Sequence, residues 1–118
     1  MSDHPFPDAG LEVTAADTLA HHRSGEIQLV DIREPYEVDA GRIAGARHIE
    51  LDDLAARAAE LDPARPVVFY CRLGARSAMA AQAFRGAGYD AWSMAGGLEA
   101  WARQALPLEP EDGTVAPH

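Results

Sequence analysis

Two short apolar runs constrain the fold more than any other feature of the sequence. They are IQLVDI at residues 27–32 and PVVFYC at residues 66–71, and both are rich in β-branched or aromatic side chains. Continuous apolar runs of this length are typical of strands that are buried on both faces. A strand covered on both faces needs helices on either side of its sheet, so the two runs predict an α/β domain.

Weaker strand patterns and several helical patterns alternate with these runs. The further strand candidates are residues 46–51 and 89–96. The helical patterns cover residues 14–25, 51–63, 75–88 and 97–106. This alternation predicts a central, mainly parallel sheet flanked by helices on both faces. In such sheets, ligands bind beyond the carboxyl ends of the strands.

The length and the composition of the two ends indicate one domain. A chain of 118 residues can bury one hydrophobic core but is too short for two domains of ordinary size. Residues 1–10 are predicted to be a flexible leader, and residues 107–118 a flexible, acidic and proline-rich tail outside the core. The predicted folded domain is therefore 11–106.

Charge and cysteine content narrow the class of protein. A formal net charge of −9 argues against a general nucleic-acid binder, because phosphate binding needs a basic face. No apolar run is long enough to span a bilayer, and the N-terminus lacks the pattern of a secretory signal. The single cysteine excludes an internal disulfide and leaves a thiol that is easiest to keep in a reducing compartment. We expect a cytoplasmic protein that binds neither nucleic acid nor membranes.

Cys71 lies where the second apolar run meets a helix. A cysteine acts as a nucleophile in its thiolate form, which positive potential favours at neutral pH. Arg72 and Arg76 supply charge, Gly74 lets the loop curl, and the helix that begins near Ala75 presents free N–H groups and its dipole. The alternative interpretation is that Cys71 is a small buried residue that ends a strand and has no chemical role. The glycine and the arginines favour a nucleophile in an anion-binding loop.

Three motifs, in order along the chain, resemble the rhodanese (sulfurtransferase) superfamily of single-domain type. Residues 29–51 are similar to its aspartate-arginine-glutamate segment and glycine-isoleucine-glycine-alanine motif. Residues 67–89 are similar to its catalytic strand, loop and helix, and residues 94–101 to its closing double-glycine and tryptophan motif. The likeness covers residues 11–106. It departs at Arg42, where the family most often has histidine, and we expect this to change a local hydrogen bond rather than catalysis.

The resemblance implies a small rhodanese-like domain with sulfurtransferase activity. Cys71 would take a sulfane sulfur from a donor such as thiosulfate, become a persulfide, and pass the sulfur to cyanide or a thiol. The backbone amides of the loop would stabilise the sulfur's charge, and its two arginines would orient the anionic donor. The residues of this loop are Arg72, Leu73, Gly74, Ala75, Arg76 and Ser77. The family needs no metal or organic cofactor, so none is expected.

Two alternatives remain open. The domain could be a sulfur-relay or regulatory binding module that delivers sulfur to a protein partner, with little turnover of thiosulfate and cyanide. It could also be a cysteine-dependent phosphatase or arsenate reductase, but the loops of those enzymes are one residue longer. Only four residues separate Cys71 from Arg76 here. In the related families this shorter loop goes with sulfur rather than phosphate.

Asp31 is the remaining candidate site residue. It ends a predicted strand, where a buried carboxylate needs hydrogen bonds from loop amides or from an arginine. The resemblance places it near the catalytic loop, which it would support without touching the substrate. The nearby Arg33, Glu34 and Glu37 are expected to form a local ion-pair or capping set. Gly96 and Gly97 are expected to allow a tight strand-to-helix turn near the loop. No histidine has a second ligand at metal-binding spacing, so no metal site is expected.

Overall fold

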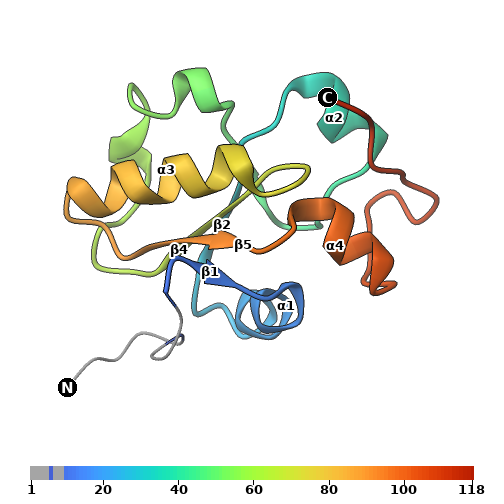
Figure 1. The fold of residues 1–118 in the computed structure, drawn as a ribbon, viewed down its shortest axis with the longest axis horizontal. Coiled ribbons are helices and arrows are strands. Elements are labelled where there is room, and N and C mark those ends of the chain that lie inside the picture. The colour runs from blue at the N-terminus through green and yellow to red at the C-terminus, as the bar shows by residue number, and fades with distance from the viewer. Residues whose placement is uncertain (1–5, 7–9) are drawn as a thin grey trace.

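The computed structural model describes Phe6 and residues 10–118, and these form a five-stranded parallel sheet with helices on both faces (Figure 1). The strand order is β1-β5-β4-β2-β3. The strands are β1 (Glu12–Val13), β2 (Gln28–Asp31), β3 (Arg47–His48), β4 (Val67–Tyr70) and β5 (Ala91–Met94). The α-helices are α1 (Ala15–Arg23), α2 (Pro35–Ala40), α3 (Ala75–Gly86) and α4 (Gly97–Arg103). The predicted α/β class with a mainly parallel sheet is confirmed.

The two apolar runs form adjacent strands in the middle of the sheet. β2 and β4 pair in parallel, with Val30 opposite Phe69, and all four residues of β4 are buried. Successive side chains of β4 enter different layers of the core. Val68 and Tyr70 join one apolar cluster, while Phe69 belongs to the other. Burial on both faces explains why these strands read as continuous apolar runs.

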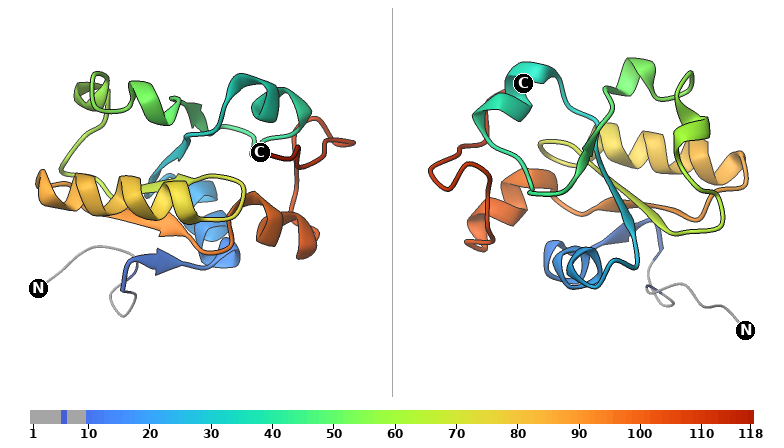
Figure 2. Two further views of the ribbon diagram at one scale, coloured as in Figure 1. Left: turned by 45° about the horizontal axis from the view of Figure 1, so that its top comes forward. Right: turned by 180° about the vertical axis from the view of Figure 1, so that it is seen from behind.

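Helices cover both faces of this sheet. α3 lies on one face, and α1 and α4 lie on the other (Figures 1 and 2). α3 approaches the sheet through the small side chains of Ala80 and Ala81, and its Phe84 ring meets the edge of Phe69 at 5.0 Å between centroids. At 12 residues α3 is the longest of these helices. In the described part of the chain, no helix is long and apolar enough to cross a bilayer.

The helix predicted over residues 51–63 is wrong. Two short 3₁₀ turns, Leu51–Asp53 and Ala58–Glu60, occupy that segment instead. Side chains from elsewhere hold its carbonyl groups: the Tyr89 hydroxyl donates to Ala58 O at 3.0 Å, and Arg47 donates to Glu60 O at 3.3 Å. These tertiary bonds compete with an α-helical ladder that local sequence alone favours.

α2 and β1 are elements that the sequence patterns did not predict, because both are short. α2 has six residues and begins with Pro35 after Glu34. The expected capping role of Glu34 and Glu37 is present, since the backbone N–H of Glu34 donates to Glu37 Oε1 at 3.0 Å. β1 has two residues and pairs with the edge of β5.

The two ends of the chain contact the domain where they are described. Phe6 lies within the predicted leader, yet it is buried and its ring lies 5.4 Å from that of Trp92; the other residues of the leader, Gly10 apart, lie outside the described residues. Residues 107–118 run along α2. Glu109 pairs its backbone with Arg42, and Tyr36 donates its hydroxyl proton to Pro117 O at 2.9 Å. The segment predicted to lie outside the core thus packs against the domain.

Candidate active site

The loop after β4 wraps around the Cys71 sulfur. Cys71 is buried, with 1% of its surface exposed, and α3 begins four residues later. The backbone N–H of Gly74 donates to Sγ at 3.1 Å, and that of Ser77 points at Sγ from 3.4 Å. Gly74 has φ +108°, a left-handed conformation that L side chains rarely adopt. The glycine therefore sets the curl that aims two N–H groups at one sulfur, and donors placed in this way stabilise negative charge.

A small pocket opens beside this sulfur. Its volume is about 180 Å³. Its lining residues are Cys71, Arg72, Leu73, Ala75, Arg76 and His118. The loop thus supplies most of the wall, and the end of the chain supplies His118. The pocket gives a small reagent a route to a cysteine that is otherwise buried.

The turn before α4 holds the loop from the other side. The backbone N–H groups of Leu98 and Glu99 donate to Cys71 O at 2.8 Å and Arg72 O at 3.0 Å. Gly97 has φ +60°, and a Cβ there would lie 2.4 Å from Arg72 O. The expectation that Gly96 and Gly97 form a tight strand-to-helix turn next to the loop is confirmed.

Arg76 is held by a buried carboxylate on α2. Its Nη1 and Nη2 donate to Oε1 and Oε2 of Glu37, both at 3.0 Å, and Glu37 is fully buried. Burial opposes the ionised carboxylate, but the hydrogen bonds from Arg76 and the Glu34 backbone outweigh it, so the pKa of Glu37 is lowered. The same hydrogen bonds raise the pKa of Arg76. Both groups are charged at neutral pH, and Glu37 belongs to the loop's ion pair as well as to the cap of its own helix.

Arg72 also faces a carboxylate. Its Nε lies 3.5 Å from Oε2 of Glu99 on α4, and this buried nitrogen has no hydrogen-bond partner among the described residues. Both loop arginines are therefore matched by acids from neighbouring helices. The sequence predicted that the arginines make the loop positive, and the structure shows that much of this charge is compensated. The N–H groups and the start of α3 remain the closest positive groups to the sulfur.

Asp31 is buried and accepts from both expected kinds of partner, a loop amide and an arginine side chain, and both belong to Arg33. Arg33 donates from its backbone N–H, Nε and Nη2 to the two carboxylate oxygens at 2.7–3.0 Å. Arg33 also donates to Gly41 O and Glu37 O, at the end and the middle of α2. Burial opposes the charge of Arg33, yet the bonds to Asp31 outweigh it and raise the pKa of Arg33. Asp31 is thus linked to α2 through Arg33, and it also interacts with Tyr70, the residue directly before Cys71.

Besides His118 at the pocket wall, sequence reasoning missed three partners of the loop's side chains: Glu37 as the partner of Arg76, Glu99 as the partner of Arg72, and Ser93 as the partner of Ser77. Ser93 lies on β5 and its Oγ is 2.7 Å from Ser77 Oγ. Glu37 follows Glu34 at capping-box spacing, which signals a helix start but not a contact 39 residues away. No local pattern marks the other two.

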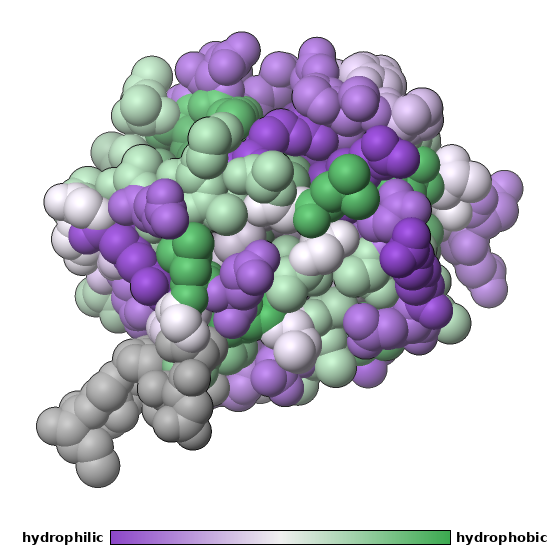
Figure 3. Space-filling view, in the orientation of Figure 1, coloured by the Kyte–Doolittle hydropathy of each residue, from purple (hydrophilic) through white to green (hydrophobic). Residues whose placement is uncertain are grey.

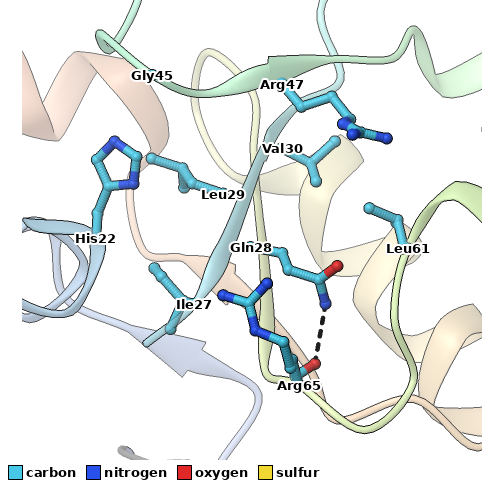
Figure 4. Close-up of a pocket in the computed structure, with 9 residues that line it drawn as sticks. All are labelled: His22, Ile27, Gln28, Leu29, Val30, Gly45, Arg47, Leu61 and Arg65. Carbon is cyan, nitrogen blue, oxygen red and sulfur yellow. Dashed lines mark hydrogen bonds between the residues drawn. The ribbon is translucent and has the colours of Figure 1, made fainter. Parts of the chain in front are cut away.

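A second hollow lies at the opposite end of the sheet, near the start of β2 (Figure 4). Its polar side chains already have partners. His22 contacts Ala44 O at 2.8 Å, Arg47 pairs with Glu60, and Arg65 donates to Gly25 O. It contains no cysteine. The pocket at Cys71 is therefore the better candidate for an active site.

Comparisons with known proteins identify the family of the chain. The profile of the Rhodanese family, described as the rhodanese-like domain, matches residues 14–104. A sulfurtransferase of Allochromatium vinosum is 38% identical over 89 residues, which are 75% of this chain and 83% of that protein. An HTH-type transcriptional regulator of Mycobacterium tuberculosis is 39% identical over 100 residues, which are 82% of this chain but only 44% of the regulator.

Solved structures show the same fold. A rhodanese-related protein from Thermoplasma volcanium superimposes with a TM-score of 0.78 and 25% identity, over 84% of this chain and 97% of that protein. The profile match spans the strand, loop and helix around Cys71 as well as the segment that carries Asp31 and Glu37. The relative named sulfurtransferase matches 75% of this chain. The chain belongs to the rhodanese family.

Proposed function

We propose that the protein is a sulfurtransferase that carries sulfur as a persulfide on Cys71. The observation that carries the proposal is the pair of N–H groups, from Gly74 and Ser77, that point at Sγ from 3.1 and 3.4 Å beside a small pocket. Such a cradle favours a charged sulfur, either as the attacking thiolate or as the terminal sulfur of a persulfide. No step of this chemistry needs a metal or an organic cofactor.

The reaction balances in two displacements. The Cys71 thiolate attacks the sulfane sulfur of thiosulfate, the bond between the two thiosulfate sulfurs breaks with its electron pair, and sulfite leaves. In the second step cyanide attacks the outer sulfur of the persulfide, thiocyanate leaves, and the thiolate is restored. A thiol acceptor would take the outer sulfur in the same way. Arg72 and Arg76 line the pocket and would orient the anionic donor. A thiol that must stay reduced suits the cytoplasm, where we place the reaction.

Intact mass spectrometry tests the proposal directly. After incubation with thiosulfate, the wild-type protein should gain about 32 Da, the mass of one sulfur atom, and cyanide should remove it with formation of thiocyanate. Cys71→Ser should show neither change while keeping the wild-type melting curve. If folded protein with a reduced thiol gains no sulfur from any sulfane donor, the proposed function is wrong.

A second candidate is delivery of the sulfur to a protein. Apart from Arg76, small, apolar or weakly polar side chains gather on the solvent-facing side of α3 next to the pocket (Figure 3). Leu73 in the loop and Met79 on α3 are 58% and 59% exposed. Complete loading of Cys71 combined with very slow thiocyanate release would favour this role. Rapid turnover with cyanide would favour the first candidate.

A further inference from the structure

Two buried serine hydroxyls form a chain that ends at the sulfur of Cys71. Ser77 is in the first turn of α3, Ser93 is on β5, and neither is exposed to solvent. Their Oγ atoms are 2.7 Å apart. Ser77 Oγ is also 3.5 Å from Cys71 Sγ and 3.2 Å from Gly74 O. The hydroxyl of Ser77 therefore has three neighbours but only one hydrogen to donate.

Hydrogen-bond satisfaction decides the direction of the serine pair. Within the described part of the chain, Ser77 Oγ is the hydrogen-bond partner of the Ser93 hydroxyl. A buried hydroxyl hydrogen without an acceptor is costly, so Ser93 donates to Ser77. If Ser77 donated to Ser93 instead, the Ser93 hydrogen would have no acceptor. The Ser77 hydroxyl would then have no hydrogen to donate to Gly74 O or to the sulfur.

This direction leaves the Ser77 hydrogen free to follow the charge of the sulfur. In the thiol form, Sγ–H points at Ser77 Oγ and Ser77 donates to Gly74 O, which also accepts from the Ala78 N–H at 2.9 Å. In the thiolate form the sulfur has no hydrogen and can accept a third hydrogen bond besides those from the Gly74 and Ser77 N–H groups. Rotation about one bond then turns the Ser77 O–H from Gly74 O to the sulfur, while Ser93 continues to donate to Ser77.

We propose that Ser93 is a positioning residue that keeps the Ser77 hydroxyl available as a third donor to the Cys71 sulfur anion. It does not touch the sulfur and acts through Ser77, because a hydroxyl that accepts a hydrogen bond is a stronger donor in turn. The inference rests on the proposed function only in that Cys71 reacts as an anion. The charged and titratable groups near the loop are unchanged in the variants that test it; they are Glu12, Glu37, Arg72, Arg76, Glu99 and His118.

The test is a double-mutant cycle on the reactivity of the thiol. Alkylation of Cys71 by iodoacetamide is followed by intact mass in the wild type, Ser77→Ala, Ser93→Ala and the double variant, at pH 7.0 and pH 9.5. At pH 7.0 Ser77→Ala should be about tenfold slower than the wild type, for loss of a hydrogen bond to a charged group. Ser93→Ala should be about threefold slower, for loss of the cooperative part of that bond. The double variant should match Ser77→Ala.

The comparison at higher pH separates positioning from simple access. If the serines act on the charge of the sulfur, the rate differences seen at pH 7.0 should become smaller at pH 9.5, because higher pH favours the thiolate in every variant. Slower variants whose deficit is as large at pH 9.5 as at pH 7.0 would show that the substitutions change the pocket instead. An unchanged rate in Ser93→Ala at pH 7.0, or effects of the two serines that simply multiply in the double variant, would overturn the proposal.

Two further variants serve as controls. Ser93→Thr keeps the hydroxyl and should restore most of the wild-type rate at pH 7.0. Ser24→Ala removes an exposed hydroxyl at the end of α1 and should change nothing. Melting curves establish that each variant is folded. Alkylation needs no sulfur donor, so it reports on the serines even if thiosulfate fails to load the wild-type protein. Such a failure to load would refute the proposed function but not the role of Ser93.

Discussion

Loss of the Glu37 carboxylate should destabilise the protein more than any surface ion pair does. The side chain of Arg76 is only 17% exposed in the wild type. Glu37→Ala removes the carboxylate that pairs with Arg76 and the acceptor for the Glu34 N–H. Breaking a buried pair by removing one partner costs about 3–5 kcal/mol, and the partial exposure of Arg76 places this pair near 3 kcal/mol. At roughly 4 °C per kcal/mol for a domain of this size, the melting temperature should fall by about 12 °C.

The variant Glu37→Gln refines the same measurement. Its amide oxygen can still accept from Glu34 and from one Arg76 nitrogen, but its NH₂ group faces the other nitrogen, donor against donor. We expect a loss of about 2 kcal/mol, between the wild type and Glu37→Ala. Urea unfolding followed by tryptophan fluorescence at pH 7 gives both values. Glu109→Gln, in the exposed pair with Arg42, is the matched control and should leave the midpoint within error. A loss below about 1 kcal/mol in Glu37→Ala would refute the reasoning.

Three more predictions follow from the ion pairs and the turn around the loop. Folding lowers the pKa of Glu37, so its ionised form stabilises the native state above the ordinary carboxyl pKa of about 4.3, and this stability is lost as the pH falls further. Unfolding midpoints of wild type and Glu37→Gln should therefore converge in acid, and a constant difference from pH 7 to pH 3 would contradict this. Gly97→Ala forces a Cβ against Arg72 O in a left-handed conformation and should cost about 3 kcal/mol in urea unfolding, whereas an unchanged midpoint would show that the turn adapts. Arg33→Ala leaves Asp31 buried and unpaired and should lose about 3–5 kcal/mol by the same assay, so a loss near zero would mean that water reaches the carboxylate.

The central part of the fold could be predicted because local pattern and tertiary position agree there. β2 and β4 are apolar on both faces since both faces are covered. α1 begins directly after Thr14, the first residue of the predicted helical pattern 14–25, and the Thr14 side chain caps the helix by accepting from the Asp17 N–H. Where tertiary contacts override local preference, prediction failed. The alanine-rich segment 51–63 favours an α-helix locally, but Tyr89 and Arg47 bind its carbonyl groups and it forms 3₁₀ turns.

The candidate site could likewise be predicted only in part from the sequence. The loop around Cys71 is contiguous in sequence, so its glycine, its arginines and the helix start could be recognised together. The partners of those arginines come from other elements, Glu37 on α2 and Glu99 on α4. Ser93 lies within a buried strand, where a lone serine carries no signal of the hydroxyl that it contacts. These contacts are set by the packing of α2, α4 and β5 around the loop, and no local pattern encodes them.

Because the two closest donors to the sulfur are main-chain N–H groups, substitution of the loop side chains that only line the pocket leaves both donors in place. A substitution at Leu73 or Ala75 changes the wall of the pocket but deletes neither the Gly74 nor the Ser77 N–H. Only proline at a donor position, or a residue that cannot follow the backbone at Gly74, would remove a donor. If the proposed function holds, the preference for one sulfur donor or acceptor over another can diverge by substitution at the pocket wall while both N–H donors stay in place, so the wall is the place to engineer new acceptors.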